Sequence, residues 1–88
     1  MDYNIREQID TWQKKLHHYE QKEIGLRERI KQGEELRQEV DKMPVGDPRI
    51  DKFYRSLSNL YTQLATLPGK IRHCKDNIAT LECELWWN

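Results

Sequence analysis

The sequence predicts an all-α protein: a long antiparallel helical hairpin of coiled-coil type, with a proline kink in its second helix. Charged residues make up 34% of the chain and hydrophobic residues only 36%, a balance that suits helices burying one narrow stripe. Hydrophobic residues recur in steps of three and four in both halves. A segment containing proline and glycine separates the halves. We therefore expect a single helical-hairpin domain over residues 1–88.

The first helix is expected over residues 3–42. Its hydrophobic side chains recur in alternating steps of four and three, which is the heptad pattern of helices that pack lengthwise on each other. Glu23, Gly33 and Arg37 fill the positions that would complete the series. We call these positions, with the matching ones of the second helix, the heptad seam. Its hydrophobic members in the first helix are Ile5, Ile9, Trp12, Leu16, Tyr19, Leu26, Ile30 and Val40.

Residues 43–47 are predicted to form the turn between the helices. Pro44 cannot continue a helix because its ring removes the amide donor, and Gly46 supplies backbone freedom. Asp47 suits the helix cap because its carboxylate can accept hydrogen bonds from unpaired amides. Pro48 suits the first helical position, where a missing N–H costs nothing. The second helix is therefore expected to begin at about residue 48.

The second helix is expected over residues 48–87, with a kink near Pro68. Because the seam passes through Pro68-Gly69 without losing phase, we prefer a kink within one helix to a chain reversal. The alternative is a three-helix bundle broken at Pro68-Gly69, since these residues also suit a tight turn and proline costs a helix interior about 3 kcal/mol. The seam positions of this helix are Ile50, Phe53, Leu57, Leu60, Leu64, Leu67, Ile71, Cys74, Ile78, Leu81 and Leu85.

A second copy of the chain is expected to cover what the hairpin leaves exposed. Two helices that share one seam bury little surface, and chains of this size commonly need a further stabilising element. Pairing of two hairpins into a four-helix bundle with two-fold symmetry would supply it. Aromatic side chains that lie off the seam, or gather where the two chain ends meet, are the predicted partner-binding residues. They are Trp86, Trp87, Tyr3, Tyr54 and Tyr61.

Basic residues gather in two segments that folding about residues 45 and 46 brings side by side. The whole chain has 15 basic and 15 acidic residues, so no overall charge attracts nucleic acid or membrane. The local cluster is nevertheless a candidate anion-binding surface. The alternative is a solvated helix face that steers contacts between copies of the chain. We call this cluster the basic band; it consists of Lys14, Lys15, Lys22, Lys70, Arg72 and Lys75.

Metal binding and catalysis are not expected. Four zinc-type ligands converge in the folded hairpin, but no two histidines have i, i+4 spacing and no Cys-x-x-Cys occurs. These four are His17, His18, His73 and Cys74. The sequence also lacks a glycine-rich phosphate loop, a nucleophile elbow and an HExxH motif. We therefore expect no metal, no cofactor and no enzymatic activity.

The cytoplasm is the expected location. No hydrophobic run approaches the ~20 residues that span a bilayer, and the acidic, polar N-terminus is unlike a secretory signal. Cys74 and Cys83 lie nine residues apart on one expected helix, roughly 13 Å along its axis, which is too far for a disulfide within one chain. Free thiols are typical of reducing compartments.

These expectations together indicate a non-enzymatic protein–protein interaction module. It would pair with itself and dock on a larger protein as a small regulator, adaptor or inhibitor. The first alternative is a nucleic-acid-binding hairpin dimer that contacts phosphates through the basic band. The second alternative is a structural subunit of a helical assembly.

Overall fold

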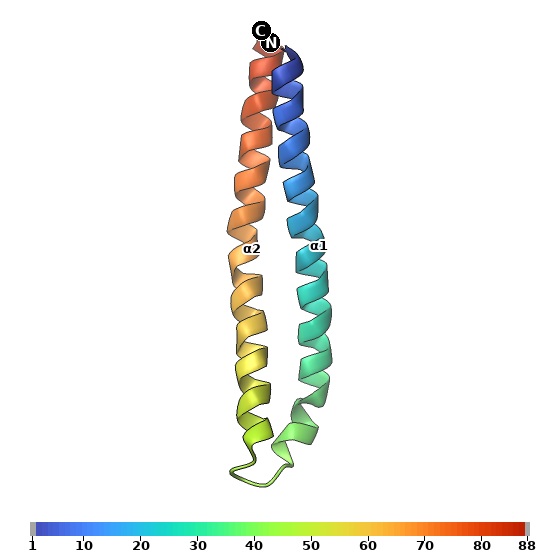
Figure 1. Ribbon diagram of the computed structural model, residues 1–88, viewed down its shortest axis with the longest axis vertical. Coiled ribbons are helices and arrows are strands. Elements are labelled where there is room, and N and C mark those ends of the chain that lie inside the picture. The colour runs from blue at the N-terminus through green and yellow to red at the C-terminus, as the bar shows by residue number, and fades with distance from the viewer. Residues whose placement is uncertain (1, 88) are drawn as a thin grey trace. The chain divides into compact units, whose positions relative to one another are not determined.

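Two α-helices account for most of the chain. The computed structural model describes the backbone of residues 2–87 and the side chains of residues 4–87 (Figure 1). The described residues form α1 (Asp2–Asp41) and α2 (Pro48–Trp87), with no β-strand among them. The predicted all-α helical hairpin is confirmed. Over the described residues, neither helix carries the long apolar stretch that a membrane crossing requires.

The chain divides into two compact units, and each joins a segment of α1 to an antiparallel segment of α2. Unit 1 contains residues 1–22 and 67–88, and unit 2 contains residues 23–66 with the turn. The beginning of α1 and the end of α2 therefore lie at the same end of unit 1 (Figure 1).

Pro68 lies inside α2, and the helix continues through it. The three-helix alternative, with a break at Pro68-Gly69, is wrong. Gly69 has none of the positive φ that a tight turn would require of it, and Gly46 is the positive-φ glycine of the chain. Burial explains why the helix survives its proline. Leu67, directly before Pro68, is only 1% exposed, and an unbroken helix keeps both Leu67 and Ile71 on the seam side.

The turn in unit 2 forms as the residue types predict. After Asp41 the chain tightens, and the Met43 amide donates to the Val40 carbonyl over 3.0 Å. Pro44 then prevents further helix because it has no amide hydrogen. Gly46 adopts φ +93°, a left-handed conformation that residues with a Cβ avoid. The change of direction therefore depends on Pro44 and Gly46 together.

Asp47 caps the start of α2. Its Oδ1 atom accepts a hydrogen bond from the Arg49 amide over 3.0 Å, which satisfies one of the unpaired donors of the first turn. The Arg49 guanidinium also donates to Oδ2 over 2.7 Å. The Arg49 side chain is the largest of the causes that lower the pKa of Asp47 below its ordinary value. The cap is therefore a charged group at physiological pH.

The core of unit 2 is narrow. Its buried side chains are Leu26, Ile30, Val40 and Leu57, each 4–8% exposed. Gly33, which interrupts the hydrophobic series in the sequence, faces Leu57. A Cβ placed on Gly33 would lie 3.0 Å from Leu57 Cδ1. The glycine therefore makes room for a leucine of the opposite helix.

The core of unit 1 is less complete. Only Leu67 and Cys74 are buried among its described residues, each 1% exposed. The remaining seam side chains are half-buried: Ile5, Ile9, Trp12, Leu16, Tyr19, Ile71, Ile78, Leu81 and Leu85. Cross-helix contacts still place the two segments side by side, because the Trp12 and His73 ring centroids lie 5.4 Å apart. Unit 1 therefore forms a seam that its own two segments do not fully cover.

Candidate interaction surface

Trp86 and Trp87 form the most exposed apolar surface of unit 1. Each indole is 88% exposed, at the last turn of α2. Adjacent helical residues point about 100° apart, so the two rings cover different directions. With the exposed Cys83 they line a shallow apolar hollow of about 270 Å³. Tyr3 was predicted to join them, but its side chain lies outside the described residues.

Tyr54 and Tyr61 have a different environment, in unit 2. The Tyr61 hydroxyl donates to a Glu34 carboxylate oxygen over 2.7 Å, and the Tyr54 hydroxyl donates to Asp41. These hydrogen bonds are the main cause of a raised pKa in both tyrosines. Both phenols therefore link α2 to α1. Tyr54 is half-buried and Tyr61 remains exposed, so part of each ring is still accessible.

The carboxylate partners of these tyrosines were not foreseen from the sequence. Glu34 and Asp41 are seven residues apart, as are Tyr61 and Tyr54, so the two pairs repeat at one-heptad spacing on both helices. This shared spacing of acids and tyrosines beside the seam is the sequence feature from which the hydrogen bonds could have been predicted. The pairs cover one flank of the unit 2 seam with polar contacts between the helices.

All six residues of the basic band lie in unit 1, and all are exposed. Three of them already have a local partner. Lys14 Nζ lies 3.1 Å from Asp10, Lys15 Nζ lies 4.6 Å from the centre of the Trp12 ring, and Lys70 Nζ lies 5.7 Å from that of Tyr19. The other three, Lys22, Arg72 and Lys75, make no ion pair with any residue that the structure describes.

The four zinc-type ligands do not assemble into a metal site. No group of three or more histidine, cysteine, aspartate or glutamate side chains within the described part of the chain could hold a metal ion. Cys74 is buried in the seam of unit 1. The His73 ring packs edge-on against Trp12, and its backbone carbonyl accepts a hydrogen bond from the Asn77 side chain over 2.7 Å.

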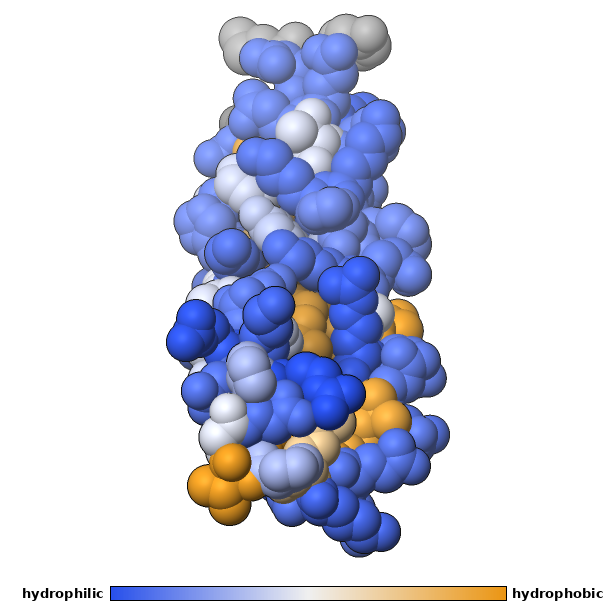
Figure 2. Space-filling view, turned by 60° about the horizontal axis from the view of Figure 1, so that its bottom comes forward, coloured by the Kyte–Doolittle hydropathy of each residue, from blue (hydrophilic) through white to orange (hydrophobic). Residues whose placement is uncertain are grey.

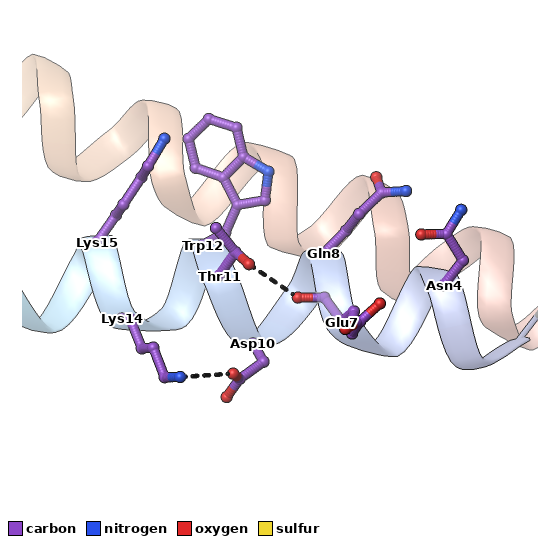
Figure 3. Close-up of a pocket in the computed structure, with 8 residues that line it drawn as sticks. All are labelled: Asn4, Glu7, Gln8, Asp10, Thr11, Trp12, Lys14 and Lys15. Atoms are coloured by element: carbon purple, nitrogen blue, oxygen red, sulfur yellow. Dashed lines mark hydrogen bonds and ion pairs between the residues drawn. The ribbon is translucent and has the colours of Figure 1, made fainter.

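A second hollow, of about 530 Å³, lies on α1 in unit 1 (Figure 3). Its lining changes charge along the helix. Glu7 and Asp10 lie toward the beginning of α1, and Lys14 and Lys15 lie further along. The Asp10–Lys14 ion pair marks the boundary between the two charges. Sequence reasoning treated Trp12 as a core residue and missed this surface, because it did not foresee that the indole would remain half-exposed.

The face of the molecule that Figure 2 shows is mostly hydrophilic. Figure 2, in which the turn end comes forward, shows hydrophobic side chains only in small separate areas among hydrophilic ones. In unit 2 the large exposed apolar side chains, apart from Tyr61, are Ile24, Leu36 and Val45. They are dispersed along the sequence, whereas Trp86 and Trp87 are adjacent. The tryptophan pair is therefore the stronger candidate for a contact with another protein.

Comparison of the chain with models of protein families, with curated proteins and with solved structures gives no match.

Proposed function

We propose that this chain is a non-enzymatic protein–protein interaction module. Two copies associate, and the resulting dimer docks on a larger protein as a small regulator, adaptor or inhibitor. The observation that carries the proposal is the incomplete burial of unit 1. Its described residues bury only Leu67 and Cys74, while its remaining seam side chains stay partly accessible to water.

The exposed tryptophans add to this support. A buried aromatic side chain removes about 150–250 Å² from water, so two indoles at the surface forgo a large hydrophobic contribution. Tryptophan is also the residue type most often found to dominate the energy of protein interfaces. Trp86 and Trp87 are each 88% exposed within one chain. A contact with another molecule would cover them without any change of fold.

Self-association is tested by light scattering coupled to size-exclusion chromatography. The proposal predicts about twice the 10.7 kDa mass of one chain. A Trp86→Ala/Trp87→Ala variant should shift toward the monomer, whereas Val45→Ala, a matched change at an exposed apolar residue of the turn, should not. A wild-type chain that stays at 10.7 kDa at every concentration would overturn the proposal. A mass that keeps growing with concentration would instead favour a structural subunit.

Docking on a larger protein is tested by affinity capture with the same variants. Wild type and Val45→Ala should recover a partner that Trp86→Ala/Trp87→Ala does not. If all three chains recover the same proteins in the same amounts, the tryptophans are not the docking anchor. Circular dichroism of each variant serves as the control for folding, since both tryptophans are exposed and their removal leaves no cavity.

Nucleic-acid binding is a second candidate, supported by Lys22, Arg72 and Lys75 of the basic band, which form no ion pair with a described residue. Two segments, residues 14–22 and 70–75, hold six basic residues and one acidic residue, a local charge of +5. Three phosphate contacts by Lys22, Arg72 and Lys75 would give a slope of about −2.7 in a plot of log affinity against log salt. Absence of any salt-sensitive complex at about 50 mM salt would remove this candidate.

A further inference from the structure

Two oppositely charged surfaces lie near each other in unit 1, and the described residues do not fully neutralise either of them. One is the basic band, with its local charge of +5. The other covers residues 4–10 and 79–87, which hold four acidic residues and one basic residue, a local charge of −3. We call it the acidic end; its members are Glu7, Asp10, Glu82, Glu84, Trp86 and Trp87. The charge of α1 changes sign within the hollow of Figure 3.

Most carboxylates of the acidic end have no ion-pair partner among the residues that the structure describes. Asp10 pairs with Lys14 over 3.1 Å. Glu7, Glu82 and Glu84 make no ion pair with any described residue. The basic band likewise has three cations without an ion pair to a described residue, so each surface offers three charges of one sign that no described residue neutralises. Charges of this kind gain from a complementary surface on another molecule, which speeds association and fixes its orientation.

The tryptophans fit the same pairing. A cation within about 6 Å of an indole face is attracted to it, and tryptophan is the best aromatic partner for this contact. Unit 1 already uses this interaction twice, because Lys15 lies over Trp12 and Lys70 lies over Tyr19. The exposed indoles of the acidic end offer two further faces to the free cations of a basic band.

We propose that the acidic end of one copy docks on the basic band of a second copy, and that the contact is reciprocal. This inference rests on the self-association proposed above and assigns its surface. Each chain carries both halves of the contact in unit 1. Two chains in opposite orientations therefore satisfy both halves at once, and the two-fold axis closes the dimer. Burial of both indoles on each chain supplies about 300–500 Å², a large part of the roughly 800 Å² per partner of a standard interface.

Cross-linking between two different chains tests the docking. One chain carries His17→Cys with Cys83→Ser, so its accessible thiol lies in the segment of the basic band; His17 is exposed and belongs to neither set of charges. The other is the wild type, whose accessible thiol is Cys83 in the acidic end, because Cys74 is buried. Isotope labelling of one chain identifies mixed species by mass after treatment with a short bismaleimide.

The proposal predicts a mixed dimer from this pair. It predicts no mixed dimer when the thiol is moved to unit 2 in a matched Lys31→Cys/Cys83→Ser chain, where residue 31 is also exposed. If the wild type is a dimer by light scattering but the His17→Cys chain gives no mixed species, the assigned surface is wrong while self-association stands. A monomeric wild type overturns both. Equal yields from His17→Cys and Lys31→Cys also overturn the assignment.

Charge reversal provides a second, independent test. Arg72→Glu/Lys75→Glu should weaken the dimer about tenfold, and Glu82→Lys/Glu84→Lys should do the same, because each places like charges at both symmetric contacts. The four substitutions combined in one chain restore opposite charges and should restore the wild-type dissociation constant. A combined variant as weak as either double variant, with its helix content retained, would refute the pairing.

Discussion

The same change, glycine to alanine, made at two positions of α1 tests the packing of unit 2. Gly25 and Gly33 both lie inside the helix, and replacing either by alanine gains about 1 kcal/mol of helix propensity. At Gly25 an added Cβ meets nothing within 4 Å. Gly25→Ala should therefore increase the free energy of unfolding by about 1 kcal/mol. At Gly33 the same Cβ would lie 3.0 Å from Leu57 Cδ1, closer than an ordinary carbon–carbon contact.

The magnitude at Gly33 follows from the burial of its neighbour. Leu57 is 4% exposed, so its side chain has little room to move away. Overpacking of a core costs about 1–3 kcal/mol, which outweighs or cancels the gain in helix propensity. Gly33→Ala should therefore be about 1–3 kcal/mol less stable than Gly25→Ala. In a domain of this size each 1 kcal/mol moves Tm by about 4–8 °C.

Thermal unfolding followed by far-UV circular dichroism measures this difference. Both variants and the wild type are compared at one protein concentration, because self-association makes Tm depend on concentration. We expect Gly25→Ala to melt above the wild type and Gly33→Ala to melt at or below it. A Gly33→Ala chain that melts as high as Gly25→Ala would refute the packing of Leu57 against Gly33, and with it the antiparallel register of unit 2.

Three further predictions concern single features of the hairpin. Pro68→Ala should raise the free energy of unfolding by up to about 3 kcal/mol, because it restores an amide donor inside α2. Urea unfolding measures this free energy, and a variant less stable than the wild type would contradict the prediction. The hydrogen bonds from Arg49 lower the pKa of Asp47. The contribution of this contact to the stability of the fold is therefore present above the ordinary carboxyl pKa, and it is lost as pH falls through the lowered value. In the Asp47→Asn variant, thermal stability should fall less as the pH is lowered. A pH dependence equal to that of the wild type would contradict a stabilising role for the Asp47 carboxylate. The raised pKa values of Tyr54 and Tyr61 act in the opposite direction: their contribution is present below the ordinary phenol pKa and is lost as pH rises through the raised value. A Tyr54→Phe/Tyr61→Phe variant should be less stable than the wild type at neutral pH, and its stability should fall less as the pH is raised. Thermal unfolding at alkaline pH that matches the wild type would argue against the hydrogen bonds.

The helices and the turn could be predicted from the sequence because local chemistry determines them. Pro44, Gly46 and Asp47 each suit one conformation, and the structure places a helix end, a positive φ and a helix cap at these residues. The unbroken seam through Pro68 correctly favoured one continuous helix over a reversal. The rule that proline breaks a helix led to the three-helix alternative, which is wrong. Burial of the seam residues beside Pro68 outweighs the cost of one proline in the helix.

The surfaces were harder to predict because they depend on which side of the seam each residue occupies. Tyr54 and Tyr61 lie beside the seam, and the sequence pattern alone did not indicate that carboxylates of α1 would accept their hydroxyl hydrogens. Gly33 looked like a gap in the series, whereas it accommodates Leu57. Trp86 and Trp87 were predicted as partner-binding residues from their place at the chain end, but the sequence did not indicate that each indole would be 88% exposed.

Amide hydrogen exchange measured at several protein concentrations tests most directly whether unit 1 carries the association. If two copies pair through the acidic end and the basic band, exchange in residues 4–22 and 67–87 should slow as concentration rises, while exchange in residues 23–66 should not change. Exchange rates in unit 1 that stay the same across the concentration range, or that change only in unit 2, would contradict the account.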